Sequence, residues 1–193
     1  MSAADTREEI LTVSARLFAT RGLAGTTMRA IADGCSIKAA SLYHHFASKD
    51  EIVAEIMTRS REFAAGLYRE IADAHLAPAA RVEAVLRATL QSFRAHPEAS
   101  QVFLENPAYV ASAPLLKSIR ADARAIDALC VRAIEEAITV GALRDDIAPL
   151  RLWLLLRNML RSTAREAATA DADDAIAILL HGIAAPTHRS GQQ

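Results

Sequence analysis

The chain has 193 residues, of which 52% are hydrophobic and 23% are charged, and its net charge is −1. This composition supplies enough apolar surface for a compact fold and excludes an intrinsically disordered chain. The near-balanced charge excludes a protein that coats nucleic acid through bulk positive charge, so any DNA binding needs basic residues gathered on one face. Only 7 glycines and 6 prolines occur, and alanine and leucine dominate, which predicts an all-α fold.

The two cysteines, Cys35 and Cys130, stand far apart, and neither belongs to a metal-ligand spacing. We therefore expect no disulfide framework, no metal and no cofactor. The first residues, MSAADTREEI, carry acids where a secretory signal needs a basic start. No segment approaches the roughly 18 apolar residues of a membrane span. We expect a cytoplasmic protein that does not bind a membrane.

Three helices are predicted before residue 48. The first covers residues 5–20, where apolar side chains recur with helical period. Thr26 or Thr27 can cap a short second helix that ends at Gly34. A tight turn then leads into a third helix over about residues 38–45.

The third predicted helix has two chemically different faces. Leu42 and Phe46 lie four residues apart and share an apolar face. Ala40 and His44 point to the opposite side, among other small or hydrogen-bonding residues. We therefore expect the apolar face to be buried and the face of small side chains to be exposed.

A long fourth helix is predicted to follow directly. Ser48 and Glu51 have the spacing of a capping box, in which Ser48 accepts from the amide of Glu51 and the Glu51 carboxylate accepts from the amide of Ser48. The apolar stripe continues to about Ala74. Prolines and Gly141 divide the remainder into predicted helices. These lie at roughly 79–95, 99–105, 115–140, 150–169 and 173–185.

Two short helices joined by a tight turn and braced by a preceding helix form a helix-turn-helix, whose second helix enters the major groove of DNA. Small side chains let its backbone approach the bases, so Ala39, Ala40 and Ser41 are candidates for base contacts. Arg29 could reach guanine from the preceding helix. Hydroxyl, ring and ammonium donors at the edges of this face are candidates for phosphate contacts. They are Thr27, Lys38, Tyr43, His44, His45 and Lys49.

The stretch RLFATRGLAGTTMRAIADGCSIKAASLYHHFASKDEI resembles the DNA-binding region of TetR-type transcriptional regulators. The resemblance covers residues 7–56, whereas the rest of the chain matches in helix layout and in GALRDDIAP. It implies a helix-turn-helix domain over residues 1–47 and a larger helical ligand-binding and dimerisation domain over residues 48–193. It also implies a homodimeric repressor, formed through the last two helices at about 150–185. Such a repressor releases a palindromic DNA operator when a small molecule binds.

The turn before the third helix departs from the family pattern. Where the family commonly has Ala-Gly-Val-Ser, this chain has Cys35, Ser36, Ile37 and Lys38. Ser36 must make the turn without the conformational freedom of glycine, at about 1 kcal/mol if its φ is positive.

Arg157 and Arg161 lie one helical turn apart in an otherwise apolar segment around Trp153. Two arginines on one face of such a helix need anionic partners or water. One interpretation is a salt bridge at the dimer interface with Glu166 or with an acid on another helix. The other is a clamp on an anionic ligand such as a carboxylate or phosphate.

The stretches ADGCSIKAASLYHHFASKDEIV and IEEAITVGALRDD, with this arginine position, are similar to the branch of the family that controls steroid or fatty-acid catabolism. That similarity implies an acyl-CoA thioester, or another small hydrophobic molecule, as the effector. Further candidates for pocket walls are aromatic and methionine side chains, which in helices more often form the core. They are Phe93, Phe103, Tyr109 and Met159.

Two other functions stay open. A small helical hydrolase or lyase needs a catalytic arrangement, but the sequence has no GxSxG, HExxH or P-loop motif and no paired acid and base. We therefore do not expect an enzyme. A DNA-binding activator that needs no ligand is compatible with every feature of the sequence.

Overall fold

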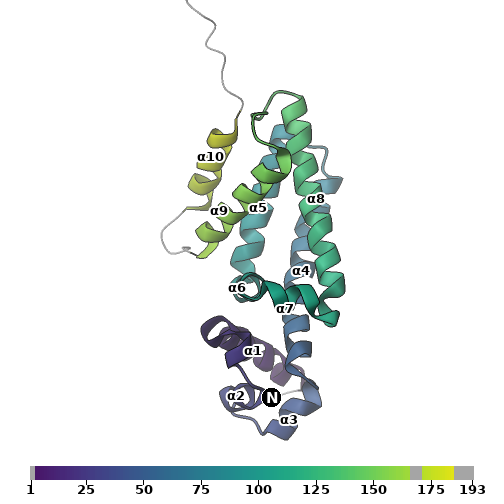
Figure 1. The fold of residues 1–193 in the computed structure, drawn as a ribbon, viewed down its shortest axis with the longest axis vertical. Helices are drawn as coiled ribbons and strands as arrows, with labels where there is room; N and C mark the ends of the chain where they lie inside the picture. The colour runs from purple at the N-terminus through teal and green to yellow at the C-terminus, as the bar shows by residue number, and fades with distance from the viewer. Residues whose placement is uncertain (1–2, 166–170, 185–193) are drawn as a thin grey trace, which may run out of the picture. The chain divides into compact units, whose positions relative to one another are not determined.

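The computed structural model describes residues 3–165 and 171–184, apart from the side chains of residues 3, 103 and 104. Within these ranges all regular secondary structure is helical, as the composition predicts (Figure 1). The chain divides into two compact units. Unit 1 comprises Met1–Phe63 and His96–Ala123, and unit 2 comprises Ala64–Ala95 and Arg124–Gln193.

The compact units do not divide at residues 47 and 48. Residues 96–123 come from the middle of the chain, yet they pack with the N-terminal helices. Packing and function need not share a boundary, so the functional division into 1–47 and 48–193 stays a prediction.

Unit 1 contains three N-terminal helices, the beginning of a long helix, and short helices from the middle of the chain, with α1 packed against α2 and α6. The bounds are α1 Ala3–Gly25, α2 Met28–Gly34, α3 Ala39–His45, α4 Lys49–Asp73, α6 Pro97–Glu105, α7 Pro107–Ser112 and the 3-10 helix η1 Pro114–Leu116. The sequence predicts α6 from residue 99 and does not predict α7 or η1. Both of these begin at a proline, which suits the first helical position. They are too short to carry a periodic apolar stripe.

The second helix begins with the predicted cap, and the first helix, predicted to end at residue 20, runs on to Gly25 with a break. A break in α1 occurs at Gly22, whose φ of 73° lies in the left-handed region. Thr27 caps α2, because its side-chain oxygen accepts from the amide of Ala30 at 3.1 Å. The hydroxyl of Thr26 is used differently and donates to the carbonyl of Gly22 at 2.8 Å.

The capping box at the start of α4 forms with one partner changed. Ser48 Oγ accepts from the amide of Glu51 at 3.2 Å, as predicted. The Glu51 carboxylate, however, accepts from the amide of Ala47 at 2.8 Å in place of the predicted Ser48 amide. Phe46 has an extended backbone directly after α3, and this turns the Ala47 amide toward the first turn of α4.

Unit 2 contains the end of α4 and most of α8, with α5 packed against α9 and α10. The bounds are α5 Pro78–Ala95, α8 Lys117–Thr139, α9 Pro149–Arg165 and α10 Ala172–Ile183. Its core includes Trp153, Leu156 and Leu160, each almost fully buried. The predicted helices over 150–169 and 173–185 therefore exist as α9 and α10, and their last predicted residues lie outside the described ranges.

Gly141 ends α8 in the way that the sequence predicts. Its φ is 71°, and its amide donates to the carbonyl of Ile138 at 2.9 Å. The amide of Ala142 donates to the carbonyl of Ala137 at 2.9 Å. Together these bonds form a Schellman motif, which satisfies carbonyls that the helix end leaves open.

Both cysteines are buried and free. Burial raises the pKa of the Cys130 thiol to about 12 and also raises the pKa of Cys35. Among the residues that the structure describes, no three His, Cys, Asp or Glu side chains gather as metal ligands would. In the same residues, no helix combines the length and the apolar character needed to cross a bilayer.

Candidate DNA-binding surface

The turn between α2 and α3 is made by Ser36 in the left-handed region, with φ of 54°. The amide of Ile37 donates to the carbonyl of Ala32 at 3.0 Å, and the amide of Ser36 donates to the carbonyl of Asp33 at 3.1 Å. The predicted condition for strain is therefore met, at about 1 kcal/mol for a residue that is not glycine. These bonds hold the turn and so determine the direction in which α3 begins relative to α2.

The apolar face of α3 anchors the helix in unit 1. Leu42 is 0% exposed and Phe46 is 2% exposed, and both belong to the core that also contains Ile10 and Ile31. Full burial of one such side chain contributes roughly 1.5–3 kcal/mol relative to exposure. A rotation of α3 about its axis would forfeit this burial, so the opposite face stays outside.

That opposite face meets solvent, as predicted from the sequence. Ala39 and Ala40 are exposed, and Ser41 is half-buried. Tyr43 is 54% exposed, and His44 is also exposed. The face therefore combines small side chains, which permit a close backbone approach, with an aromatic hydroxyl and a ring nitrogen.

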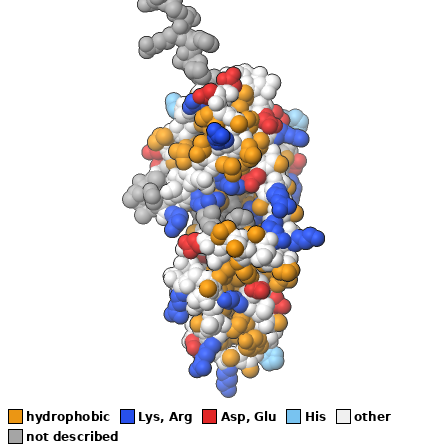
Figure 2. Space-filling view, in the orientation of Figure 1, with side chains coloured by type: hydrophobic (Ala, Val, Ile, Leu, Met, Phe, Trp, Pro, Cys, Tyr) orange, Lys and Arg blue, Asp and Glu red, His pale blue; other side chains and the backbone are white. Residues whose placement is uncertain are grey.

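One hydroxyl and two basic side chains from α2 and the turn after it are also exposed. Thr27, Arg29 and Lys38 are all exposed. In Figure 2, Lys and Arg side chains stand out at the end of unit 1 that carries α2 and α3. The hydroxyl oxygen of Thr27 caps α2, but its hydrogen stays available for a phosphate oxygen.

One predicted phosphate contact already serves the fold, and another is half-buried. The Lys49 ammonium donates to the carbonyls of Leu23 and Thr26, at 2.5 and 2.9 Å. An ammonium has three hydrogens, so one is left for another acceptor. His45 is half-buried, and its backbone carbonyl accepts from Arg7 at 3.1 Å.

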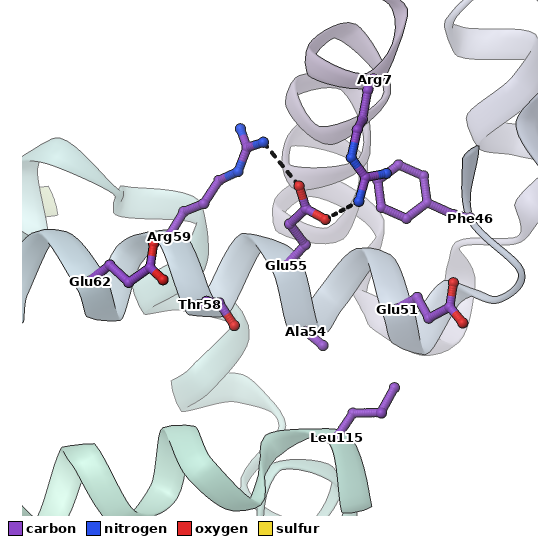
Figure 3. A pocket seen from close by; sticks show the side chains of 9 residues that line it. All are labelled: Arg7, Phe46, Glu51, Ala54, Glu55, Thr58, Arg59, Glu62 and Leu115. Atoms are coloured by element: carbon purple, nitrogen blue, oxygen red, sulfur yellow. Dashed lines mark hydrogen bonds and ion pairs between the residues drawn. The ribbon is translucent and has the colours of Figure 1, made fainter. Parts of the chain in front are cut away.

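An ionic network that the sequence analysis missed lies around a pocket of about 470 Å³ in unit 1 (Figure 3). The Arg7 guanidinium pairs with Glu55, which also accepts from Arg59 at 2.9 Å. Arg59 donates to both carboxylate oxygens of Glu8, at 2.6 and 2.7 Å, and these bonds lower the pKa of Glu8. Arg7 and Glu55 stand 48 positions apart, so no local pattern reveals the pair. The pocket is also lined by Phe46, Glu51, Ala54, Thr58, Glu62 and Leu115.

In unit 2, Arg157 has an acid on another helix as its partner. Both carboxylate oxygens of Asp127, on α8, accept from Arg157 at 2.7 Å. Trp153 Nε1 donates to the same carboxylate at 2.8 Å. Glu166, the other predicted partner, lies outside the described residues. Among the acids on the other helices, Asp127 could be recognised in the sequence because it stands beside the apolar stripe of α8.

Arg161 is half-buried near the same cluster. Its guanidinium carbon lies 5.5 Å from the centre of the Phe93 ring. A guanidinium nitrogen of Arg161 donates to the side-chain oxygen of Asn158 at 3.2 Å. Burial, and secondarily the charge of Arg157, lowers the pKa of Arg161. Its Nε is buried without a hydrogen-bond partner in the part of the chain that the structure describes.

Of the other three predicted pocket residues, one belongs to unit 2 and two belong to unit 1. Met159 is about half exposed on α9. Tyr109 belongs to unit 1, and its hydroxyl donates to Asp50 at 2.8 Å. Burial, and secondarily this bond, raises the pKa of Tyr109. Phe103 lies in α6, but its side chain is outside the described part of the structure.

Comparison with known proteins agrees with this arrangement. The sequence model of the family described as bacterial regulatory proteins, tetR family, matches residues 10–56. The HTH-type transcriptional repressor KstR2 of Mycobacterium tuberculosis is 33% identical over 141 residues, which span 73% of this chain and 70% of that protein. KstR2 of Rhodococcus jostii is 30% identical over 187 residues, spanning 93% of this chain and 92% of that protein.

The fold leads to the same family. The solved structure of the ketosteroid transcriptional regulator KstR2 of Mycobacterium tuberculosis has a TM-score of 0.85 to this chain at 28% identity. The match covers 93% of this chain and 95% of that one. The chain therefore belongs to the TetR family of bacterial regulatory proteins and is a DNA-binding transcriptional regulator.

Proposed function

We propose that this protein is a homodimeric, cytoplasmic repressor without enzymatic activity, which binds a palindromic operator through α3. We further propose that a small, largely apolar ligand with an anionic group binds in unit 2 and releases the operator. The observation that carries the DNA-binding role is the exposed small-residue face of α3, held outward by buried Leu42 and Phe46.

Each part of this surface has a proposed contact. Ala39, Ala40 and Ser41 contact base edges, where small side chains allow close approach, and Arg29 reaches guanine O6 and N7. The flanking donors contact phosphates and fix the register of the protein on the duplex. These are Thr27, Lys38, Tyr43, His44, His45 and the remaining hydrogen of Lys49.

The exposed apolar side chains of α9 and α10 support a homodimer through residues 150–185. Leu150, Leu155, Met159 and Ile178 each expose half or more of their surface. Such exposure on neighbouring helices is typical of an interaction surface. A Cβ added at Gly182 would meet nothing within 4 Å, so α10 leaves room for a second helix to approach. In a symmetric dimer, two copies of α3 would face successive major grooves about 34–36 Å apart.

Charge supports an anionic effector group in unit 2. Among the residues that the structure describes, the cluster holds two guanidinium groups, Arg157 and Arg161, and the carboxylate of Asp127. Because that carboxylate already accepts from Arg157 and Trp153, Arg161 is the better donor to a ligand. The solved structure of KstR2 from Mycobacterium tuberculosis is described as that of a ketosteroid transcriptional regulator. An acyl-CoA thioester of an apolar acid would supply both apolar surface and anionic groups.

The proposed release is a shift between two conformations. α4 contributes residues to both units, so a state in which α4 tilts would change the spacing of the two α3 helices. A coupling of about 1–3 kcal/mol lowers DNA affinity roughly 5- to 150-fold.

Selection of bound sequences from random DNA tests the operator-binding part. We expect a palindrome with half-sites about one helical turn apart, and retention that weakens steeply with salt. Tyr43→Ala should weaken retention at the selected site by about 10-fold without unfolding the dimer. Recovery of no motif, with substrate turnover by the purified protein alone, would instead favour a small helical enzyme.

Release of the selected operator by acyl-CoA thioesters and by the corresponding free acids tests the effector part. Arg161→Met should raise the thioester concentration needed for release about 10-fold, since a hydrogen bond to a charged group is worth roughly 1.5–3 kcal/mol. Arg132→Met, at an exposed arginine on α8 in the same unit and outside the proposed dimer surface, is the matched control and should leave release unchanged. No release by any compound of this class would favour a regulator that needs no ligand.

A further inference from the structure

Arg7 makes three different contacts at the C-terminal end of α3. Its guanidinium donates to the backbone carbonyl of His45 at 3.1 Å. It lies 4.1 Å above the centre of the Phe46 ring, and it forms an ion pair with Glu55 (Figure 3). One side chain of α1 thus contacts the last residue of α3, the residue after it, and α4.

The chemistry of these contacts suits the end of a short helix. The last carbonyls of a helix lack partners within it and carry partial negative charge, so a cation bound there is favourable. α3 has only seven residues, and its own capping bond is the amide of Phe46 donating to the carbonyl of Leu42. The planar guanidinium can stack on Phe46 and bond in its plane at once, which an ammonium cannot do.

A second layer holds Arg7 in place. Glu55 accepts from Arg59 as well as from Arg7, and Arg59 is fixed by both oxygens of Glu8 on α1. The side chains of Arg7 and Glu55 are 37% and 23% exposed, so their pair is less screened than a surface ion pair. The network therefore links α1 to α4, and it links both helices to the C-terminal end of α3.

We propose that Arg7, Glu55 and Arg59 are positioning residues for operator recognition. They fix the C-terminal end of α3 on α1 and α4, so sequence-specific affinity depends on them although they do not contact DNA. This inference rests on the proposed role of α3 in base recognition.

The sign of the effect separates positioning from simple electrostatics. Glu55→Gln removes a negative charge from the DNA-binding unit, so bulk electrostatics alone predicts tighter DNA binding. Loss of positioning predicts weaker binding to the operator instead. Glu62→Gln removes the same charge two turns further along α4, on an exposed side chain, and is the matched control.

The experiment measures the affinity of the full-length protein for its selected operator and for random-sequence DNA over a range of salt concentrations. Glu55→Gln and Arg7→Met should each lower operator affinity about 10-fold, the size of one lost base contact. Affinity for random-sequence DNA should be unchanged or higher in Glu55→Gln, which loses a negative charge, and unchanged or slightly lower in Arg7→Met, which loses a positive one. The double variant should lose little more operator affinity than the single variant that binds the operator less tightly, because both changes break the same Arg7–Glu55 pair. Glu62→Gln should bind the operator as tightly as the unaltered protein, or more tightly.

Three outcomes would overturn the inference. The first is operator affinity of Glu55→Gln equal to or above that of Glu62→Gln. The second is a lower salt dependence of DNA affinity in Arg7→Met, reduced by the amount that one phosphate contact contributes. That result would make Arg7 a direct DNA contact. The third is an equal loss on operator and random DNA, which would indicate general damage to the unit. Operator retention by the unaltered protein, and its loss in Tyr43→Ala, test the role of α3 separately.

Discussion

Phe46→Ala should lower the free energy of unfolding by about 3–5 kcal/mol, a large share of the roughly 5–15 kcal/mol available to a folded domain. Phe46 is 2% exposed in the core of unit 1. Its removal leaves a cavity, and it takes away the ring on which Arg7 stacks. Because the face of α3 is held outward by this anchor, operator binding should be lost together with stability.

Chemical denaturation followed by circular dichroism measures this effect. The single tryptophan, Trp153, lies in unit 2, so its fluorescence is the wrong signal for unit 1. Phe46→Leu keeps most of the apolar volume and should cost under about 1.5 kcal/mol. Tyr43→Ala, on the exposed side of the same helix, should change stability by less than about 0.5 kcal/mol. Equal destabilisation by Phe46→Ala and Tyr43→Ala would contradict the assignment of the two faces.

The helix-turn-helix could be predicted from the sequence because its determinants are local. The four-residue spacing of Leu42 and Phe46 identifies the buried face of α3, and both side chains are buried. The absence of glycine at Ser36 predicts strain in the turn, and the positive φ meets that condition. Thr27 and Gly141 likewise act at helix ends through contacts with residues at most four positions away.

The features that the sequence analysis missed depend on contacts between distant segments. Glu55 meets Arg7 across 48 positions, and Asp127 meets Arg157 across 30. Charged residues on helices usually face solvent, so the Arg7–Glu55 pair does not stand out from the many other charges in the chain. For Arg157 the apolar surroundings predict an acidic partner on another helix, but they do not identify Asp127 as that acid. The same holds for residues 96–123, whose packing in unit 1 depends on tertiary structure and not on helical period.

The N-terminal cap of α4 could be predicted from the sequence only in part. The spacing of Ser48 and Glu51 predicts the correct cap residues of α4, but the carboxylate binds the amide one residue earlier than expected. Which amide lies within reach depends on how the chain leaves α3, and that path is set by the burial of Phe46.

Ala40→Glu should lower operator affinity at least about 100-fold, close to the level of non-specific binding. Ala40 is exposed in the first turn of α3, where an acidic side chain is compatible with the helix dipole, so folding should be unaffected. On DNA, however, a carboxylate at this position would meet base edges and phosphates at close range. The loss should therefore come from binding alone.

Ala111→Glu is the matched control, because Ala111 is an exposed alanine on α7, outside the helix-turn-helix. It adds the same charge to the same unit and should change operator affinity no more than about 3-fold. Circular dichroism and the oligomeric state of both variants should match those of the unaltered protein.

Operator affinity of Ala40→Glu beside Ala111→Glu is the most direct test that the exposed face of α3 contacts DNA. The account predicts loss of operator retention in Ala40→Glu alone, with both variants folded. Retention by Ala40→Glu equal to that of Ala111→Glu would contradict it and would place the DNA contacts on another surface.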